Sequence, residues 1–158
     1  MLALDGPSGS GKTTLAGALA KILGGAPVVH LDDLYPGWEG LAAGVDRVRR
    51  WVLEPLARGE PAGYRRYDWA SGRDAEWHQV PAAPELIIDG CGSGARACAP
   101  YLSLLVWVEA PVAVRRRRAL ARDGEAYCPY WQTWARQEEA LYAEERTRDR
   151  ADVIVRTG

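Results

Sequence analysis

Residues 6–14 read GPSGSGKTT and combine glycines, a lysine and hydroxyl side chains at the spacing of a phosphate-binding loop. Gly6-x-x-x-x-Gly11-Lys12-Thr13 matches the pattern GxxxxGK[ST]. Glycines let backbone N–H groups turn toward phosphate oxygens, and the helix that follows adds the positive end of its dipole. We expect Lys12 to reach the β- and γ-phosphates and the Thr13 hydroxyl to bind Mg²⁺. The predicted nucleotide-binding residues are Gly6, Ser8, Gly9, Ser10, Gly11, Lys12, Thr13 and Thr14.

The segments on either side of this loop favour nucleotide binding over an ordinary glycine-rich turn. Residues 2–4 form a short apolar strand candidate ahead of the loop. After it, Leu15, Leu19, Ile22 and Leu23 fall on one face of a helix that begins near Lys12. Strand, glycine loop and helix is the order that a phosphate-binding loop requires.

The rest of the chain alternates apolar strands with helices. The expected strands are Val28–Leu31, Glu85–Asp89, Leu104–Val108 and Asp152–Val155. The expected helices are Leu41–Leu56, Val112–Ala121 and Gln132–Arg146. Continuous apolar strands separated by helices are typical of a parallel sheet covered on both faces. The sequence therefore predicts a single α/β domain over residues 1–158 with the P-loop NTPase fold, a five-stranded, mainly parallel sheet, helices on both faces and a short lid.

Two aspartates follow expected strands, where ligands of such sheets bind. Asp89 ends the strand at residues 85–89 and is placed to hold a magnesium-bound water. Asp32 is placed to accept the proton of an attacking hydroxyl or to help order the metal. Two plainer roles remain open: Asp33 can cap the next helix, and Asp89 with the glycine after it can form a turn.

The four arginines at residues 115–118 divide into two groups when placed on a helix. Arg115, Arg118 and Arg122 lie within an arc of roughly 60° at 100° per residue, and the other two arginines point elsewhere. A single stripe that ends at a short lid, approximately residues 123–131, suits guanidinium groups that close over transferring phosphates. The alternative is a solvated helix face.

Taken in order, these segments resemble the uridine kinase-like family of P-loop small-molecule kinases. The segments that carry the resemblance are GPSGSGKTT, HLDDLY, LIIDG, VEAPVAVRRRRALARD and ADVIVRTG. The resemblance implies that Asp32 is the catalytic carboxylate, with Tyr35 beside the acceptor. It also carries over catalytic roles for Lys12, Arg115, Arg118 and Arg122, and metal binding by Thr13 and Asp89.

An acceptor-binding hairpin is implied at approximately residues 63–80, where YDW resembles the family's element that covers the nucleoside. The implied acceptor-binding residues are Asp32, Tyr35, Tyr67, Asp68, Trp69 and Arg73. The chain departs from the family at Gly72, where a pyrimidine-reading histidine is expected, and His78 lies six residues further on. The aromatic stretch at residues 127–134 either packs as a lid helix or stacks on a base.

We therefore expect an enzyme that moves the γ-phosphate of ATP, with Mg²⁺, to a hydroxyl of a small molecule whose identity stays open. The alternative is a nucleotide-binding ATPase or regulatory module without such an acceptor; the NKxD element of a GTPase is not present. A net charge of −1 gives no bulk attraction to nucleic acid, and the longest apolar run is too short to span a membrane. Three cysteines without metal-binding spacing indicate reduced thiols and a cytoplasmic location. The sequence does not fix the oligomeric state.

Overall fold

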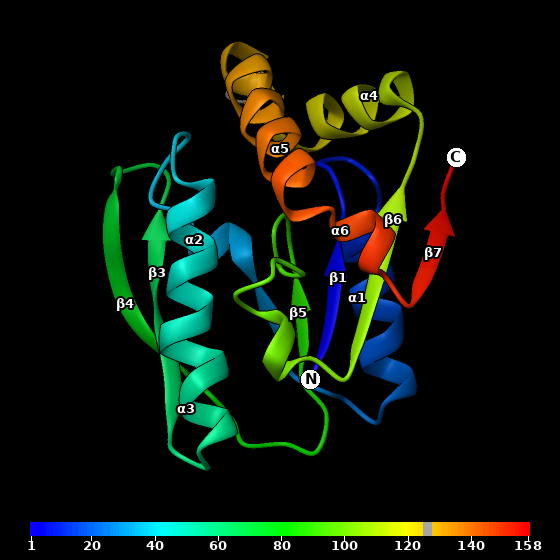
Figure 1. The fold of residues 1–158 in the computed structure, drawn as a ribbon. Coiled ribbons are helices and arrows are strands. Elements are labelled where there is room, and N and C mark those ends of the chain that lie inside the picture. Colours follow the sequence, from blue (N-terminus) through cyan, green and yellow to red (C-terminus); the bar gives the residue numbers. More distant parts are fainter. Residues whose placement is uncertain (125–127) are drawn as a thin grey trace.

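A parallel sheet forms the centre of the described chain in the computed structural model (Figure 1). The described residues form a five-stranded sheet of order β2-β5-β1-β6-β7, and each neighbouring pair runs parallel. Its strands are β1 (Leu2–Asp5), β2 (Val28–His30), β5 (Ile87–Asp89), β6 (Leu104–Glu109) and β7 (Val153–Arg156). The predicted α/β fold is confirmed. Because β5 lies between β1 and β2, the residues that follow these three strands emerge side by side.

The structure describes residues 1–124 and 128–158, without the side chains of Arg122, Asp123 and Cys128. The helices in these ranges are α1 (Lys12–Ile22), α2 (Leu41–Val48), α3 (Glu54–Ala57), α4 (Val112–Asp123), α5 (Trp131–Glu145) and α6 (Thr147–Arg150). Shorter helical turns are Leu31–Asp33, Ala99–Tyr101 and Cys128–Tyr130. None of the helices described is long and apolar enough to cross a membrane.

The helix predicted over residues 41–56 contains a widened turn. A π-helical segment, Arg49–Leu53, joins α2 to α3. Pro55 lies in the first turn of α3. Proline has no N–H to continue the α-helical ladder, which accounts for the local change in hydrogen bonding.

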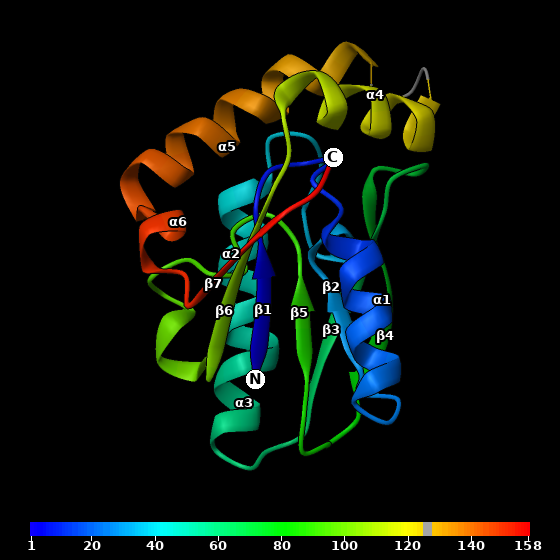
Figure 2. The ribbon, with the colours of Figure 1, turned by 90° about the vertical axis from the view of Figure 1, so that its right-hand side faces the viewer.

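Helices cover both faces of the sheet (Figures 1 and 2). Helix α1 packs on one face, where Ala16 joins a buried cluster with Leu4 and Ile87. The other face carries a larger cluster that includes Ile88 and residues of α2 and α5. Successive residues of β5 thus point to opposite clusters, as the two-residue period of a strand requires.

An antiparallel hairpin stands beside this sheet, formed by β3 (Ala62–Asp68) and β4 (Arg73–Val80). The Asp68 carboxylate accepts hydrogen bonds from the backbone N–H of Ala70 and the hydroxyl of Ser71, which holds the connecting turn. Gly72 completes the turn with φ 68°, in the left-handed region that favours glycine. The predicted hairpin at residues 63–80 is therefore present, and its tip lies at the same end of the molecule as the phosphate loop (Figure 1).

Helices α4 and α5 lie beyond the carboxyl ends of the strands in both views (Figures 1 and 2). The lid predicted at residues 123–131 runs from the last residue of α4 to the first residue of α5. Its middle residues, 125–127, lie outside the described ranges.

One buried carboxylate connects three of these segments. Asp5, the last residue of β1, is fully buried. It accepts hydrogen bonds from the backbone N–H groups of Gly6 at 2.6 Å and of Gly92 and Gly94 at 2.8 Å. The hydroxyl of Tyr142 in α5 donates a fourth bond, also at 2.8 Å. Asp5 therefore ties together the phosphate loop, the segment after β5 and α5.

We expect Asp5→Asn to lower the free energy of unfolding by about 3 kcal/mol or more, because in either orientation the amide NH₂ faces at least one backbone N–H group and leaves it unpaired. Tyr142→Phe removes a single donor and should lower it by about 1 kcal/mol. Urea unfolding of both variants measures the difference. Equal losses would show that Asp5 does not organise the three segments.

Candidate functional site

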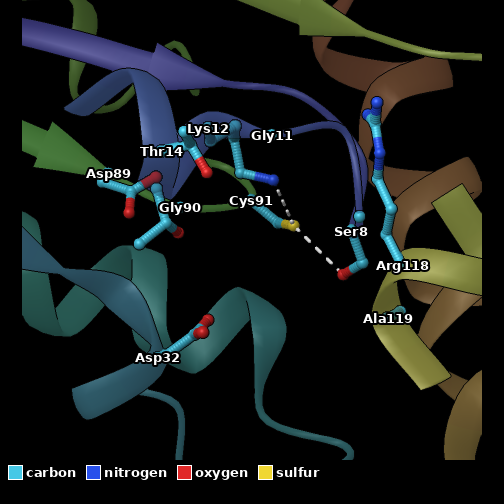
Figure 3. Close-up of a pocket in the computed structure, with 12 residues that line it drawn as sticks. Ser8, Gly11, Lys12, Thr14, Asp32, Asp89, Gly90, Cys91, Arg118 and Ala119 are labelled. Carbon is cyan, nitrogen blue, oxygen red and sulfur yellow. Dashed lines mark hydrogen bonds between the residues drawn. The ribbon is translucent and has the colours of Figure 1, made fainter. Parts of the chain in front are cut away.

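A cavity of about 320 Å³ opens where the phosphate loop meets the carboxyl ends of β2 and β5 (Figure 3). Its lining residues are Ser8, Gly9, Gly11, Lys12, Thr13, Thr14, Asp32, Asp89, Gly90, Cys91, Arg118 and Ala119. The structure thus brings the loop, both predicted aspartates and one predicted arginine to a single space. In Figure 3, Asp32 lies across this space from Lys12 and Ser8.

The loop owes its shape to glycines at two of these positions. Gly9 has φ 76° and Gly11, directly before α1, has φ 98°. Both values lie in the left-handed region that other residues rarely adopt. Gly9 has a second constraint, because a Cβ built there would lie 2.2 Å from the carbonyl oxygen of Arg115 in α4. Side-chain bulk is therefore excluded where α4 crosses the loop.

Lys12, at the start of α1, folds back over the loop. Its Nζ donates to the carbonyl oxygens of Gly6 at 2.7 Å and Pro7 at 3.1 Å, and it lies 3.6 Å from the Sγ of Cys91. Burial alone would lower the pKa of Lys12, but the neighbouring carboxylates of Glu138, Asp89 and Asp5 raise it above the ordinary value. The ammonium group of Lys12 is thus held near the N-terminus of α1, where the helix dipole adds further positive charge.

Two residues predicted to bind nucleotide do not line the cavity. Gly6 instead supplies the carbonyl that accepts from Lys12. The Ser10 side chain is buried, and its hydroxyl has no hydrogen-bond partner among the described residues. The carbonyl of Ser10 accepts a bond of 2.6 Å from the hydroxyl of Thr157. These residues shape the loop from behind rather than face the space.

Asp89 lines the cavity with a buried carboxylate whose two oxygen atoms differ in their partners. Its side chain is 3 % exposed, and Oδ2 lies 2.8 Å from Nδ1 of His30. The other oxygen, Oδ1, is buried and has no hydrogen-bond partner among the described residues. A hydrogen bond to Asp89 is the main cause that raises the pKa of His30. A buried carboxylate oxygen without a partner, on a residue that lines the same cavity as Thr13, fits a hard cation such as Mg²⁺.

Asp32 and Asp33 face different partners. Asp32 is exposed and lines the cavity, and its backbone carbonyl accepts a 2.9 Å bond from the indole N–H of Trp69. The Asp33 carboxylate instead accepts a 3.3 Å bond from the hydroxyl of Tyr64 in β3. The residue before α2 is Gly40, and no side chain caps this helix among the described residues. Asp33 therefore does not act as the cap of α2.

Tyr35 lies in the core instead of on the wall of the cavity. Its side chain is 1 % exposed, and its hydroxyl donates a 2.8 Å bond to the carbonyl of Cys91. Its ring packs edge-on against Trp134 at 4.8 Å. A buried tyrosine is stable where its hydroxyl finds a partner, which the segment after β5 supplies. Tyr35 therefore supports Cys91 and contributes no surface to the cavity described above.

The hairpin residues lie beside Asp32 and outside the 320 Å³ cavity. Trp69 packs against Tyr67, with ring centroids 5.3 Å apart, and contacts Asp32 through its indole N–H. Asp68 holds the hairpin turn, and Arg73 is exposed and paired with it across the strands. Among the predicted acceptor-binding side chains on the hairpin, Trp69 contacts Asp32.

Trp38, which no sequence pattern indicated, joins the hairpin to the region before α5. Its ring lies 4.6 Å from that of Trp69 and is stacked on Tyr130 at 4.6 Å with a 6° interplanar angle. Trp134 is 4 % exposed and packs edge-on against Trp38 at 6.4 Å. In the aromatic stretch at residues 127–134, Tyr130 and Trp134 therefore pack on protein rings, and residue 127 lies outside the described residues.

The arginine run divides as the angular argument predicts. Arg116 and Arg117 are exposed, whereas Arg115 and Arg118 are partly buried. Arg115 donates to the carbonyl of Ser8 at 3.3 Å, and Arg118 donates to the Thr157 hydroxyl at 2.9 Å. The guanidinium of Arg118 points away from Asp32 in Figure 3. The side chain of Arg122, on α4, lies outside the part of the chain that the structure describes.

Glu138 is a polar residue that the sequence reasoning missed. It is 4 % exposed, and its Oε1 accepts a 2.7 Å bond from the backbone N–H of Ser8 and a 2.9 Å bond from the indole of Trp134. The one sequence signal was its place four residues after Trp134, on the same face of a helix.

The fold is shared with solved structures of kinases. One is a possible uridine kinase from Bacillus stearothermophilus, with a TM-score of 0.70 and 21 % identity over 98 % of this chain and 86 % of that one. Another is shikimate kinase from Acinetobacter baumannii in complex with shikimate, with a TM-score of 0.58 and 20 % identity over 99 % of this chain and 83 % of that one. No protein-family model and no curated protein sequence matches the chain. These likenesses show the P-loop kinase fold.

We expect Gly9→Ala to lower the free energy of unfolding by more than about 1 kcal/mol, because the new Cβ meets backbone of α4 and the φ angle is unfavourable. Gly17→Ala in α1 is the matched control. Nothing lies within 4 Å of a Cβ at Gly17, so this change should stabilise the protein by about 0.5–1 kcal/mol. Urea unfolding compares the two. Effects of the same sign and size would contradict the close approach of α4 to the loop.

Proposed function

We propose that this protein is an ATP-dependent phosphotransferase that moves the γ-phosphate to a hydroxyl of a small molecule. The observation that supports this most directly is the shared cavity, in which Asp32 and Asp89 face a glycine-shaped phosphate loop. A phosphate cradle alone fits any nucleotide-binding protein. A carboxylate across the cavity from the cradle adds a group that can act on an acceptor.

The donor half of the reaction rests on the loop and α1. Lys12 lies within the cavity wall and exchanges the carbonyls of Gly6 and Pro7 for phosphate oxygens when nucleotide binds. The residues that fit Mg²⁺ are Thr13, through its hydroxyl, and Asp89, through its buried Oδ1 or a bound water. Mg²⁺ when bound neutralises charge that develops on the phosphates. His30 holds Asp89 in place through Oδ2.

The acceptor half rests on Asp32. An exposed carboxylate that lines the cavity can orient an acceptor hydroxyl and take its proton as the oxygen attacks the γ-phosphate. Catalysis in such reactions comes mostly from positioning and electrostatics. Trp69 fixes the backbone of Asp32 from the hairpin side, and we place the acceptor in the cavity, beside Asp32.

The aromatic rings near Asp32 favour a compact or flat acceptor. Trp38 and Tyr67 pack against Trp69, whose indole contacts Asp32, and aromatic groups enclose such ligands well. The two structural neighbours above are named for different acceptors, uridine and shikimate, so the fold selects no acceptor by itself. A screen of nucleosides, sugars, vitamins and amino alcohols with ATP and Mg²⁺, read as ADP formation, identifies the class. ATP turnover that no acceptor stimulates would favour the ATPase alternative.

With an acceptor identified, Asp32→Asn should retain ATP binding and lower kcat by about 100-fold or more, because the amide keeps the shape but does not take the proton. Asp33→Asn is the matched control, since the neighbouring carboxylate faces Tyr64 instead of the cavity. It should change kcat by no more than about threefold. Wild-type kcat in the Asp32→Asn variant would rule out the role of Asp32 as base.

Among the arginines of α4, Arg118→Ala should lower kcat by about tenfold or more, because Arg118 lines the cavity and can turn toward the phosphates. Arg116→Ala, on the exposed side of the same helix, should change kcat by no more than about twofold. Steady-state kinetics at saturating ATP measures both, and thermal unfolding checks that the Arg118–Thr157 bond is not needed for folding. Equal, small losses of kcat in the two variants would show that the arginines of α4 are solvated surface charges.

A further inference from the structure

The phosphate loop already holds an anion from its own chain. Glu138 projects from α5 and is buried, and its Oε1 accepts the backbone N–H of Ser8 at 2.7 Å. Its Oε2 lies 3.9 Å from the guanidinium of Arg115, and the thiol of Cys91 lies 3.2 Å from Oε1. Ser8 and Cys91 both line the cavity, so the carboxylate lies directly behind its wall.

We propose that Glu138 is an internal competitor of the nucleotide phosphates, a carboxylate that accepts the N–H group of Ser8 in the phosphate loop and weakens the binding of polyphosphate. The proposal rests on the nucleotide-binding function proposed above. It assigns Glu138 a positioning role that sets affinity for the donor, separate from the transfer step.

Glu138 and a nucleotide phosphate can compete for the same hydrogen-bond donor of the loop. Backbone N–H groups of a phosphate loop bind anions, and a carboxylate oxygen accepts them as a phosphate oxygen does. The N–H of Ser8 already donates to Glu138. A phosphate that takes this N–H must displace the carboxylate, which keeps its second donor, the indole of Trp134 at 2.9 Å.

The carboxylate of Glu138 also carries a charge of the same sign as the phosphates. Lys12 and Arg115 form a cationic pair around the loop, and Glu138 is the acidic residue in contact with Arg115 among the described ion pairs. Burial raises the pKa of Cys91, so its sulfur stays a neutral thiol and adds no second anion. With no nucleotide the carboxylate stabilises these cations. With nucleotide it repels the phosphates in a region of low dielectric, where a charge has a large effect.

Loss of the Glu138 charge should have opposite effects on the stability of the protein without nucleotide and on its affinity for nucleotide. Removal of the charge leaves Lys12 and Arg115 uncompensated when no nucleotide is bound and lowers the stability of the protein. The same removal strengthens binding, and the gain grows with the number of ligand charges. If Glu138 only supported the fold, its substitution would lower stability and would either weaken nucleotide binding or leave it unchanged.

The test is calorimetric titration of the full chain with ATP, ADP, AMP and adenosine, each with Mg²⁺. Glu138→Gln keeps an oxygen acceptor for Ser8 and Trp134 and removes the charge. We expect its Kd for ATP to fall by about tenfold, with a smaller gain for ADP, a smaller one for AMP and none for adenosine, while the melting temperature without ligand falls. Glu139→Gln, at the exposed next position, is the matched control and should leave every Kd unchanged.

Glu138→Asp is the second variant, because it keeps the charge but withdraws it by one methylene. It should tighten ATP binding in the same direction by a smaller factor, and it keeps the test decisive if Glu138→Gln does not fold. An unchanged or weaker ATP affinity in the variants, or an equal gain for adenosine, overturns the proposal while normal wild-type ATP binding leaves the proposed function intact. If neither wild type nor variant binds ATP, both proposals fall together.

Discussion

The burial of one carboxylate, Asp5, is the constraint on which the site depends. Three backbone N–H groups and a tyrosine hydroxyl converge on it from the phosphate loop, the segment after β5 and α5. Burial raises the pKa of Asp5, and these four donors oppose the rise. An arrangement with fewer donors would leave either a buried charge or buried N–H groups unpaired. The positions of the loop, of Cys91 and of Glu138 therefore follow from a single residue at the end of β1.

Two further contacts hold the phosphate loop by its carbonyl oxygens. Arg115 donates to the carbonyl of Ser8, and Thr157 donates to that of Ser10. A peptide unit whose carbonyl is held on one side presents its N–H on the other, so such contacts select the direction in which the loop's donors point. The contacts come from α4 and from the residues after β7. Two segments that are distant in sequence from the phosphate loop therefore help to fix its conformation.

Much of the site could be predicted because its signals are local. The spacing of Gly6, Gly11, Lys12 and Thr13 requires only a strand before it and a helix after it, and both formed as expected. Parallel strands place residues that follow them at one edge, which brought Asp32 and Asp89 together. Tyr35 and Glu138 were different, because their environments are made by distant segments. Spacing shows the face on which a side chain lies, but burial among Cys91, Ser8 and Arg115 depends on packing that no local pattern records.

Trp38 touches rings from two other elements at once, Trp69 at the tip of the hairpin and Tyr130 just before α5. The fluorescence of an indole ring depends on the groups and the solvent next to it. A rearrangement of these elements should therefore change the fluorescence of Trp38 and Trp69. The chain thus carries an intrinsic optical reporter beside Asp32, where its hairpin meets the end of its helical layer. Events at this junction can be followed in real time without a label attached to the protein.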